Sequence, residues 1–340
     1  MTPTHPDDAG PAADPAADPD HDAAAPADPV GPALPRARAG SSPQHLLTTL
    51  LGDYWAQRSE HLPSAALVAL LGEFEIAPAA ARAALNRLAR RGVLVSSRRG
   101  RTTSYGLAPG ATDLLLAGAH RFVSFGSEPR AWDGRWTLVL LALNERERDQ
   151  RYVIRSRLRW LGFAPLYDGT WVSPRPVAEQ ARQELDSLGL QDLTIFTAEA
   201  QPGAARPPIA AWHLDDVAAT YRLFVSDHDP LRAKIRSGQV SAAEALLART
   251  SIMDRWRAFP GIDPDLPLHE LPHHWPRPAA YALFVEVYDA LGPLAAIRVR
   301  QLVHRHSPEL AELITFATTD DLLETGRRAL ARRQGSGQRG

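Results

Sequence analysis

The chain has 340 residues, with 38 Lys and Arg against 39 Asp and Glu, and it contains no cysteine. At about 150 residues per domain, this length favours two domains, with three possible. The absence of cysteine excludes a disulfide scaffold, a thiolate nucleophile, an iron–sulfur cluster and cysteine-ligated zinc, and it suits a reducing compartment. The 44% hydrophobic composition is that of a globular protein. No window approaches 18 uninterrupted apolar residues and the N-terminus lacks a secretory signal, so we expect a cytoplasmic protein.

The two ends of the chain differ in composition from the rest. Residues 1–43 contain ten Pro, twelve Ala and seven Asp, with only two basic residues. This stretch has too little apolar surface to offset the entropy of ordering, which predicts a disordered acidic tail. A second disordered tail is predicted over the Gly-rich residues 332–340. Because the acidic tail lowers the total charge, the folded part is more basic than the near-neutral sum suggests.

The first predicted module, residues 44–127, has an order of elements typical of a DNA-binding fold. Apolar spacing predicts amphipathic helices over 45–57, 62–76 and 78–91. Gly92 is suited to the position that follows a helix. Two strands, 93–97 and 102–107, then flank a turn at Gly100. The order helix, helix, helix, hairpin predicts a winged helix-turn-helix domain.

Positive charge is concentrated on the third helix and the hairpin of this module. Seven arginines and no acidic residue lie between positions 82 and 101. Helical spacing places Arg82, Asn86 and Arg90 in one row, opposite the apolar stripe. Arg and Asn read guanine and adenine edges in a major groove, and a basic hairpin tip suits phosphates or a minor groove. The alternatives are a solvated basic face or a winged helix that binds another protein. The predicted DNA-contacting residues are Arg82, Asn86, Arg87, Arg90, Arg91, Arg98, Arg99, Arg101, Thr102 and Thr103.

Two further modules follow. Over residues 130–205 the predicted order is strand 135–143, helix 146–161, strands 164–167 and 170–173 around Asp168-Gly169, helix 176–188 and strand 193–198. This βαββαβ order is ferredoxin-like. Residues 210–331 are expected to be helical, with helices over 215–236, 241–259, 278–291, 294–304 and 319–331. A proline-rich connector, 259–278, interrupts them. The predicted fold class is therefore α+β and multidomain.

Four segments, in order, carry a resemblance to a known family. They are RAALNRLARRGVLVSSRRGRTTSYGL (82–107), WDGRWTLVLLAL (132–143), RSRLRWLGFAPLYDGTWVSPRP (155–176) and DRWRAFPGIDPDLPLHELPHHWP (254–276). The chain resembles the PaaX family of bacterial transcriptional repressors over about residues 45–305. The resemblance implies a winged-helix domain, a central ferredoxin-like domain similar to a small CRISPR-associated nuclease, and a helical C-terminal domain. Asn86 departs from the family, in which a small hydroxyl residue is usual there, so the operator is expected to differ.

The resemblance also implies a mechanism. Family members act as dimers on palindromic operators, and the best-known members repress phenylacetate catabolism and release DNA on binding phenylacetyl-CoA. A CoA site needs cations for phosphates and aromatic rings for the adenine or the acyl group. Two groups meet this need: Arg135, Arg155, Arg157 and Arg159 with Trp160 and Trp171, and Arg255, Trp256 and Arg257 beside His273–Trp275. Each can also be explained by packing, as can Trp136. The candidate ligand-binding residues are Arg135, Arg159, Trp171, Trp256, Arg257, His273 and Trp275.

No enzymatic activity, metal or bound cofactor is expected. The first central strand ends at Leu143-Asn144-Glu145, and Asn is a poor ligand for a hard nuclease metal. His269, His273 and His274 lie in a proline-broken segment without a partnering carboxylate at metalloprotease spacing. No GxSxG, Walker or GxGxxG pattern stands at a strand–helix junction.

Overall fold

The computed structural model describes residues 42–127, 131–142, 151–190 and 192–337. They belong to one unit of the chain, Pro32–Gly340, and every contact discussed below lies within it. Positions 1–41 of the expected acidic tail lie outside the described residues. The same is true of positions 143–150, where the first central strand was expected to end and the next helix to begin.

The N-terminal part has the predicted order of three helices and a hairpin, and it continues into a fourth helix. The predicted helix over 62–76 is wrong at its start. Leu62 and Pro63 form a short strand paired with Tyr105 and Ser104. Pairing across the chain overrode the apolar spacing here, and the helix begins one residue after Pro63. The elements are α1 (Pro43–Tyr54), β1 (Leu62–Pro63), α2 (Ser64–Gly72), α3 (Pro78–Arg90), β2 (Leu94–Arg99), β3 (Thr102–Leu107) and α4 (Pro109–Ser124).

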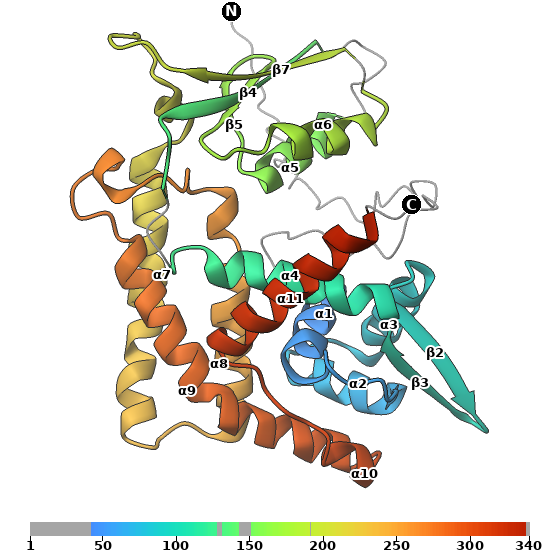
Figure 1. The fold of residues 1–340 in the computed structure, drawn as a ribbon. Coiled ribbons are helices and arrows are strands. Elements are labelled where there is room, and N and C mark those ends of the chain that lie inside the picture. The colour runs from blue at the N-terminus through green and yellow to red at the C-terminus, as the bar shows by residue number, and fades with distance from the viewer. Residues whose placement is uncertain (1–41, 128–130, 143–150, 191, 338–340) are drawn as a thin grey trace, which may run out of the picture. The chain divides into compact units, whose positions relative to one another are not determined.

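The ends of α3 follow from its sequence. Pro78 stands in the first turn, where no backbone donor is needed. After Arg91 the chain turns at Gly92, whose φ of 68° lies in the left-handed region that favours glycine. The amide of Val93 then bonds back to the carbonyl of Leu88. This turn directs the chain into the hairpin, and α3 lies beside β2 (Figure 1).

The last helix, α11 (Thr319–Gly337), packs along α4 and corrects one prediction. The predicted disordered tail over 332–340 is wrong for residues 332–337, which continue this helix. Gly326 explains the close approach of the two helices, because a Cβ there would lie 2.6 Å from the carbonyl oxygen of Leu116 and collide with His120. Near its end, Arg332 pairs with Asp113 of α4. The ion pair of Arg332 thus connects the last part of α11 to α4.

The central part confirms the ferredoxin-like prediction. Its antiparallel sheet has the order β5-β6-β4-β7, as the βαββαβ connection requires. One face of β4 contributes Val139 and Leu141 to a core shared with the two helices. Gly169, with φ 72°, forms the predicted tight turn between β5 and β6. The elements are β4 (Arg135–Leu141), α5 (Arg151–Leu161), β5 (Ala164–Tyr167), β6 (Thr170–Ser173), α6 (Ala178–Asp186) and β7 (Leu193–Glu199).

The C-terminal part is helical, as expected, but its longest helix was predicted as two. α9 runs without a break through Pro293, although proline removes a helical hydrogen bond at a cost of about 3 kcal/mol. Leu291 and Ala295 are both buried, so packing holds the helix together on either side of the proline. The elements are η2 (Pro208–Ala211), α7 (Leu214–Arg236), α8 (Ala242–Trp256), η3 (Phe259–Gly261), η4 (Leu268–Glu270), α9 (Arg277–His304) and α10 (Pro308–Ala311).

α9 is long and apolar enough to cross a membrane by length and composition alone. Half of its most apolar window is buried inside the protein, as in the core helix of a globular fold. The helix is therefore explained by the core it forms with α7 and α8.

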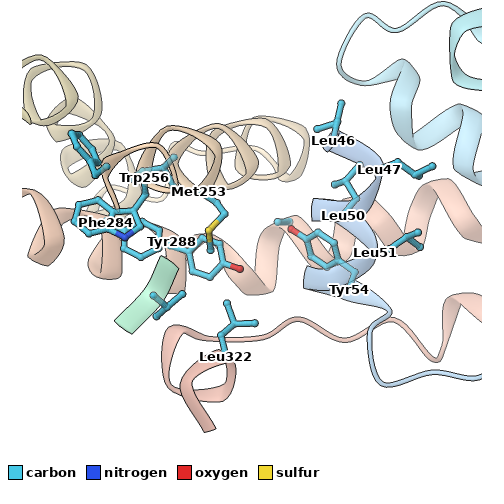
Figure 2. Packing of buried hydrophobic residues seen from close by; sticks show 14 of the residues in the cluster. Leu46, Leu47, Leu50, Leu51, Tyr54, Met253, Trp256, Phe284, Tyr288 and Leu322 are labelled. Atoms are coloured by element: carbon cyan, nitrogen blue, oxygen red, sulfur yellow. The ribbon is translucent and has the colours of Figure 1, made fainter. Parts of the chain in front are cut away.

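One large core joins the N-terminal helices to the C-terminal ones. Leu46, Leu50 and Tyr54 of α1 lie in the same cluster as Trp256 and Tyr288 (Figure 2). The indole of Trp256 is fully buried and stacks on Phe284, with ring centroids 5.0 Å apart. The predicted N-terminal and C-terminal modules thus share one core.

A buried ion pair crosses this core. Arg249 of α8, with no exposed surface, lies 3.7 Å from Asp53 of α1. Its Nε donates to the carbonyl of Tyr288 (3.0 Å), and a second nitrogen donates to the carbonyl of Ala317. The guanidinium also lies over the Tyr288 ring, 3.9 Å from its centroid. The Tyr288 hydroxyl donates to Asp53 (2.9 Å). Asp53 and Arg249 therefore connect α1, α8 and α9.

Arg249→Met should destabilise the fold in a pH-dependent way. Removing one partner of a buried ion pair costs about 3–5 kcal/mol. Burial raises the pKa of the Asp53 carboxyl, which Arg249 and Tyr288 counteract. Without Arg249, the folded variant retains a proton on Asp53 at pH values where the unfolded chain, with a pKa of about 4, has lost it. The free energy of unfolding of the variant should therefore fall as pH rises through the folded-state pKa.

Urea unfolding at several pH values measures this effect. The control is the double variant Asp53→Asn, Arg249→Met, in which the titrating group is gone and the added pH slope should vanish. A single variant as stable as the natural chain at every pH would contradict the role given to the pair.

Gly326→Val should separate α4 from α11. The new side chain would overlap His120 and the Leu116 carbonyl, and overpacking of this kind costs about 1–3 kcal/mol. Gly118 of α4 provides the matched control, since a Cβ there meets nothing within 4 Å. Gly118→Ala should slightly stabilise the helix, by about 0.5–1 kcal/mol. Thermal unfolding compares the two, and equal melting temperatures would contradict the close packing.

Candidate nucleic-acid interface

The third helix separates into an apolar face and a cationic face, as its sequence predicts. Ala81, Ala84, Leu85 and Leu88 are buried in the large core, and these are the positions of the predicted stripe. Arg82, Asn86 and Arg90 are exposed along the opposite side. The core therefore fixes the rotation of α3 about its own axis and directs these three side chains outward.

The hairpin extends the cationic face. β2 and β3 pair in register from Leu94 opposite Leu107 to Arg99 opposite Thr102. The turn is made by Gly100, with φ 60°, and Arg101. At the tip Arg98, Arg99, Arg101 and Thr102 are exposed, whereas Thr103 is half-buried. The Nε of Arg98 donates to the carbonyl of Gly100 (3.3 Å), which holds this arginine across the turn.

The arginines of this surface are not neutralised by acids in the part of the chain that the structure describes. Arg82, Arg90, Arg99 and Arg101 make no ion pair or hydrogen bond to any described residue. Arg91 donates to the Gln44 side chain of α1 (3.2 Å), an uncharged partner. The Nε of the half-buried Arg87 has no hydrogen-bond partner among the described residues. Among the described residues, the surface thus presents positive charge without an acidic partner.

A groove of about 530 Å³ lies between α3 and the hairpin. The hydroxyl of Tyr105, on β3, donates across it to the side-chain oxygen of Asn86 (3.1 Å). Sequence analysis assigned Asn86 to the interface but missed Tyr105, because an aromatic residue in a strand gives no sign of what its hydroxyl reaches. The groove is lined by Ala83, Asn86, Arg87, Ala89, Arg90, Ser96 and Tyr105.

Polar contacts fix this surface to the C-terminal helices. Glu73, which follows α2, forms a two-point ion pair with Arg298 of α9, with both N–O distances at 2.8 Å. Arg257, a predicted ligand cation, instead donates to His45 (2.7 Å) and Thr49 (2.9 Å) of α1. Burial lowers the pKa of Arg257, and Asp254 and Asp53 counteract this. Arg257, which follows α8, therefore connects the end of that helix to α1.

The structure does not bring the predicted ligand-binding residues together. Trp171 lies in the core of the central sheet, whereas Trp256 and Trp275 lie in the large core. All three indoles are buried, so the packing explanation holds for them, as it does for Trp136. Arg135, Arg159 and His273 are exposed.

The other residues considered for the effector also differ in exposure. Trp160 is 45% exposed, with the guanidinium of Arg121 lying 4.1 Å from its ring centroid. Arg155 is exposed as well. Arg157 pairs with Glu184, and Arg255 pairs with Asp227. An exposed aromatic and basic group thus remains on α5, and the buried tryptophans are not part of it.

The proline-rich connector is organised around a buried carboxylate, Asp263. Its two oxygens accept from Arg277 (2.9 Å), Tyr221 (2.9 Å) and Trp275 (3.1 Å). Burial and the nearby Asp263 raise the pKa of Tyr221, which keeps it a hydroxyl donor. Since its indole donor is used here, Trp275 is a structural residue of the connector.

The three connector histidines do not gather into a site. His269, His273 and His274 are all exposed, and His269 lies 3.6 Å from the neighbouring Glu270. Within the described ranges, no group of three or more His, Asp or Glu side chains could hold a metal ion.

Trp275→Phe should lower stability through Asp263. The ring volume largely remains, but the carboxylate loses one of its donors inside the protein. A hydrogen bond to a charged group contributes about 1.5–3 kcal/mol. Chemical unfolding measures the loss, and His273→Ala in the same connector is the control, because its side chain is exposed. A Trp275→Phe protein as stable as the His273→Ala protein would contradict this assignment.

Comparisons with known proteins cover most of the chain. Family profiles match in order: PaaX-like protein over residues 42–110, PaaX protein central Cas2-like domain over 129–210, and PaaX-like protein C-terminal domain over 212–301. The transcriptional repressor PaaX of Escherichia coli K12 is 27% identical over 258 residues, covering 74% of this chain and 80% of that protein. A solved structure, uncharacterized protein Rv0674 from Mycobacterium tuberculosis, is 19% identical with a TM-score of 0.47, covering 75% of this chain and 97% of that one. The helix α11 lies beyond the matched residues.

Proposed function

This chain belongs to the PaaX family of transcriptional regulators, and we propose that it is a repressor that binds operator DNA through α3 and the β2–β3 hairpin. The similar Escherichia coli protein is a transcriptional repressor. A regulator of this kind acts in the cytoplasm and catalyses no reaction. The observation that carries the proposal is the cationic surface of α3 and the hairpin, whose arginines have no acidic partners among the described residues.

We infer that the N-terminal part is a winged helix-turn-helix. In this arrangement α3 enters the major groove and the hairpin is the wing. Arg82 and Asn86 lie on the outward face of α3, where they would contact bases. The other arginines of the surface would contact phosphates, as would the hydroxyls of Thr102 and Thr103 at the wing. The proposed phosphate contacts are Arg87, Arg90, Arg91, Arg98, Arg99 and Arg101.

We further propose that the protein acts as a homodimer released by an acyl-CoA such as phenylacetyl-CoA. Membership of the family supports both parts of this proposal. A dimer would place its two α3 helices in successive major grooves, about 34 Å apart. An effector that favours a different dimer geometry needs only about 1.4 kcal/mol of differential affinity to weaken DNA binding tenfold.

The candidate effector residues narrow to those that are exposed. Arg135, Arg159 and His273 remain available for phosphates, and Trp160 is available for stacking. The buried Trp171, Trp256 and Trp275 would contribute only through a rearrangement of the core. The α5 surface of Arg155, Arg159 and Trp160 is therefore the first place to look for the CoA nucleotide.

The test is an anisotropy titration of the full chain against the intergenic DNA upstream of its own gene, at two salt concentrations. Arg82→Ala should weaken binding by about 1–3 kcal/mol and relax the preference for one base pair. Arg99→Ala should weaken binding to all sequences and reduce the salt slope by about 1. The matched control is Arg222→Ala, Arg236→Ala, which removes two exposed arginines of α7 and should leave binding unchanged.

Addition of phenylacetyl-CoA tests the effector separately. Weaker DNA binding in the presence of phenylacetyl-CoA supports the effector proposal. Unchanged DNA binding contradicts phenylacetyl-CoA as the effector, but it does not contradict the proposal that the protein is a repressor. No selective binding by the natural chain would overturn DNA recognition. It would favour the alternative, a winged helix that binds another protein.

A further inference from the structure

We propose that Tyr105 is a specificity-determining residue, which fixes the side-chain amide of Asn86 in the orientation that reads adenine. This inference rests on the proposed function, since it assigns a role within DNA recognition. The observation that carries it is the hydrogen bond from the Tyr105 hydroxyl to Asn86 Oδ1, at 3.1 Å, between the wing and α3.

Tyr105 is held rigidly enough to act in this way. It lies on β3, the central strand of the sheet β1-β3-β2, where it pairs with Leu62 on one side and Ser96 on the other. Its ring belongs to the large core, and the residue is only 8% exposed. With the backbone paired on both sides and the ring enclosed, the hydroxyl has little freedom to leave its position at the groove.

The hydrogen bond to Tyr105 sets the orientation of the Asn86 side-chain amide. An asparagine amide has an oxygen that accepts and a nitrogen that donates, and rotation by half a turn exchanges them. A tyrosine hydroxyl can donate or accept. In the structure it donates, so the oxygen of Asn86 lies on the side facing the strand. The nitrogen is then directed away from Tyr105, and it has no other partner among the described residues.

This orientation suits adenine. In the major groove adenine presents an acceptor at N7 and a donor at N6, which asparagine reads with its nitrogen and its oxygen together. The Asn86 oxygen has two lone pairs, so it can accept from Tyr105 and from the base at once. A half-turn of the amide would place donor against donor and acceptor against acceptor. The bond to Tyr105 therefore holds the Asn86 amide at the groove before DNA is bound, with its oxygen toward the strand.

Base-preference profiles test this proposal. The full chain is allowed to select from a randomised DNA duplex pool, and the natural protein, Tyr105→Phe and Asn86→Ala are compared. Asn86→Ala identifies the base position that Asn86 reads. Tyr105→Phe should reduce the preference for adenine there by about 2- to 12-fold, the value of one ordinary hydrogen bond. Preferences at other positions should stay the same, and the double variant should lose no more than Asn86→Ala alone.

The matched control is Tyr152→Phe, which removes an exposed tyrosine hydroxyl on α5 and should leave the whole profile unchanged. Melting temperatures are measured alongside. If Tyr105→Phe fails to fold, Tyr105→Met makes the same comparison, because its flexible side chain can fill the space of the ring and carries no hydroxyl. That variant should lose the adenine preference in the same way.

An unchanged adenine preference in the variant used would overturn the inference, and so would an equal loss at every base position. If the natural chain selects no sequence, the proposed function itself fails. The two failures are therefore distinguishable, because only the first leaves a selective natural protein.

Discussion

The buried pair of Asp53 and Arg249 is the constraint on which the arrangement of the described residues depends. A guanidinium without exposed surface is tolerated only where nearby groups compensate its charge. Here a carboxylate, two backbone carbonyls and a tyrosine ring provide that compensation. Because these groups come from α1, α9 and the segment before α11, the charge can be satisfied only when the N-terminal helices are seated on the C-terminal ones. α3 packs against α1 and α2, so its position depends on the same contact.

This attachment gives the cationic surface a physical connection to the rest of the protein. Glu73 with Arg298 and His45 with Arg257 add further polar contacts across the same boundary. The central sheet is connected to the C-terminal part through Arg175, which follows β6. Arg175 donates to the carbonyl of Pro260 (2.9 Å) and lies 3.4 Å from Asp265 in the connector. Contacts therefore run from the central sheet through the connector and the C-terminal helices to α1. A ligand that repacks any of these elements would act on the position of α3, and a small differential affinity is enough to change DNA occupancy.

The candidate site shows where sequence reasoning succeeds and where it stops. The cationic face of α3 was predictable, because the apolar stripe and the 3.6-residue period together decide which side of a helix faces outward. The turn at Gly100 was predictable for a similar local reason. For the candidate ligand-binding residues, local periodicity could not decide between packing and ligand binding. Trp256 and Trp275 are of the residue type that stacks on a bound ligand. In the structure, however, Trp256 stacks on Phe284 and Trp275 donates to Asp263. A tryptophan that packs and one that binds a ligand are identical in sequence, and only the neighbours that folding brings from elsewhere distinguish them.

The sequence by itself determined the order of the elements, the three-part organisation, the ferredoxin-like connection and the basic helix and hairpin. Each of these depends on local periodicity, turn residues or charge, which short stretches of chain contain in full. Only the tertiary structure decided that Leu62 and Pro63 form a strand, that α9 continues through Pro293, and that the Gly-rich end continues α11. In the first two cases local preference was opposed by contacts with residues far away in the chain. The bond between Tyr105 and Asn86 belongs to the same class, since the two residues stand 19 positions apart and meet only because the hairpin folds back onto α3.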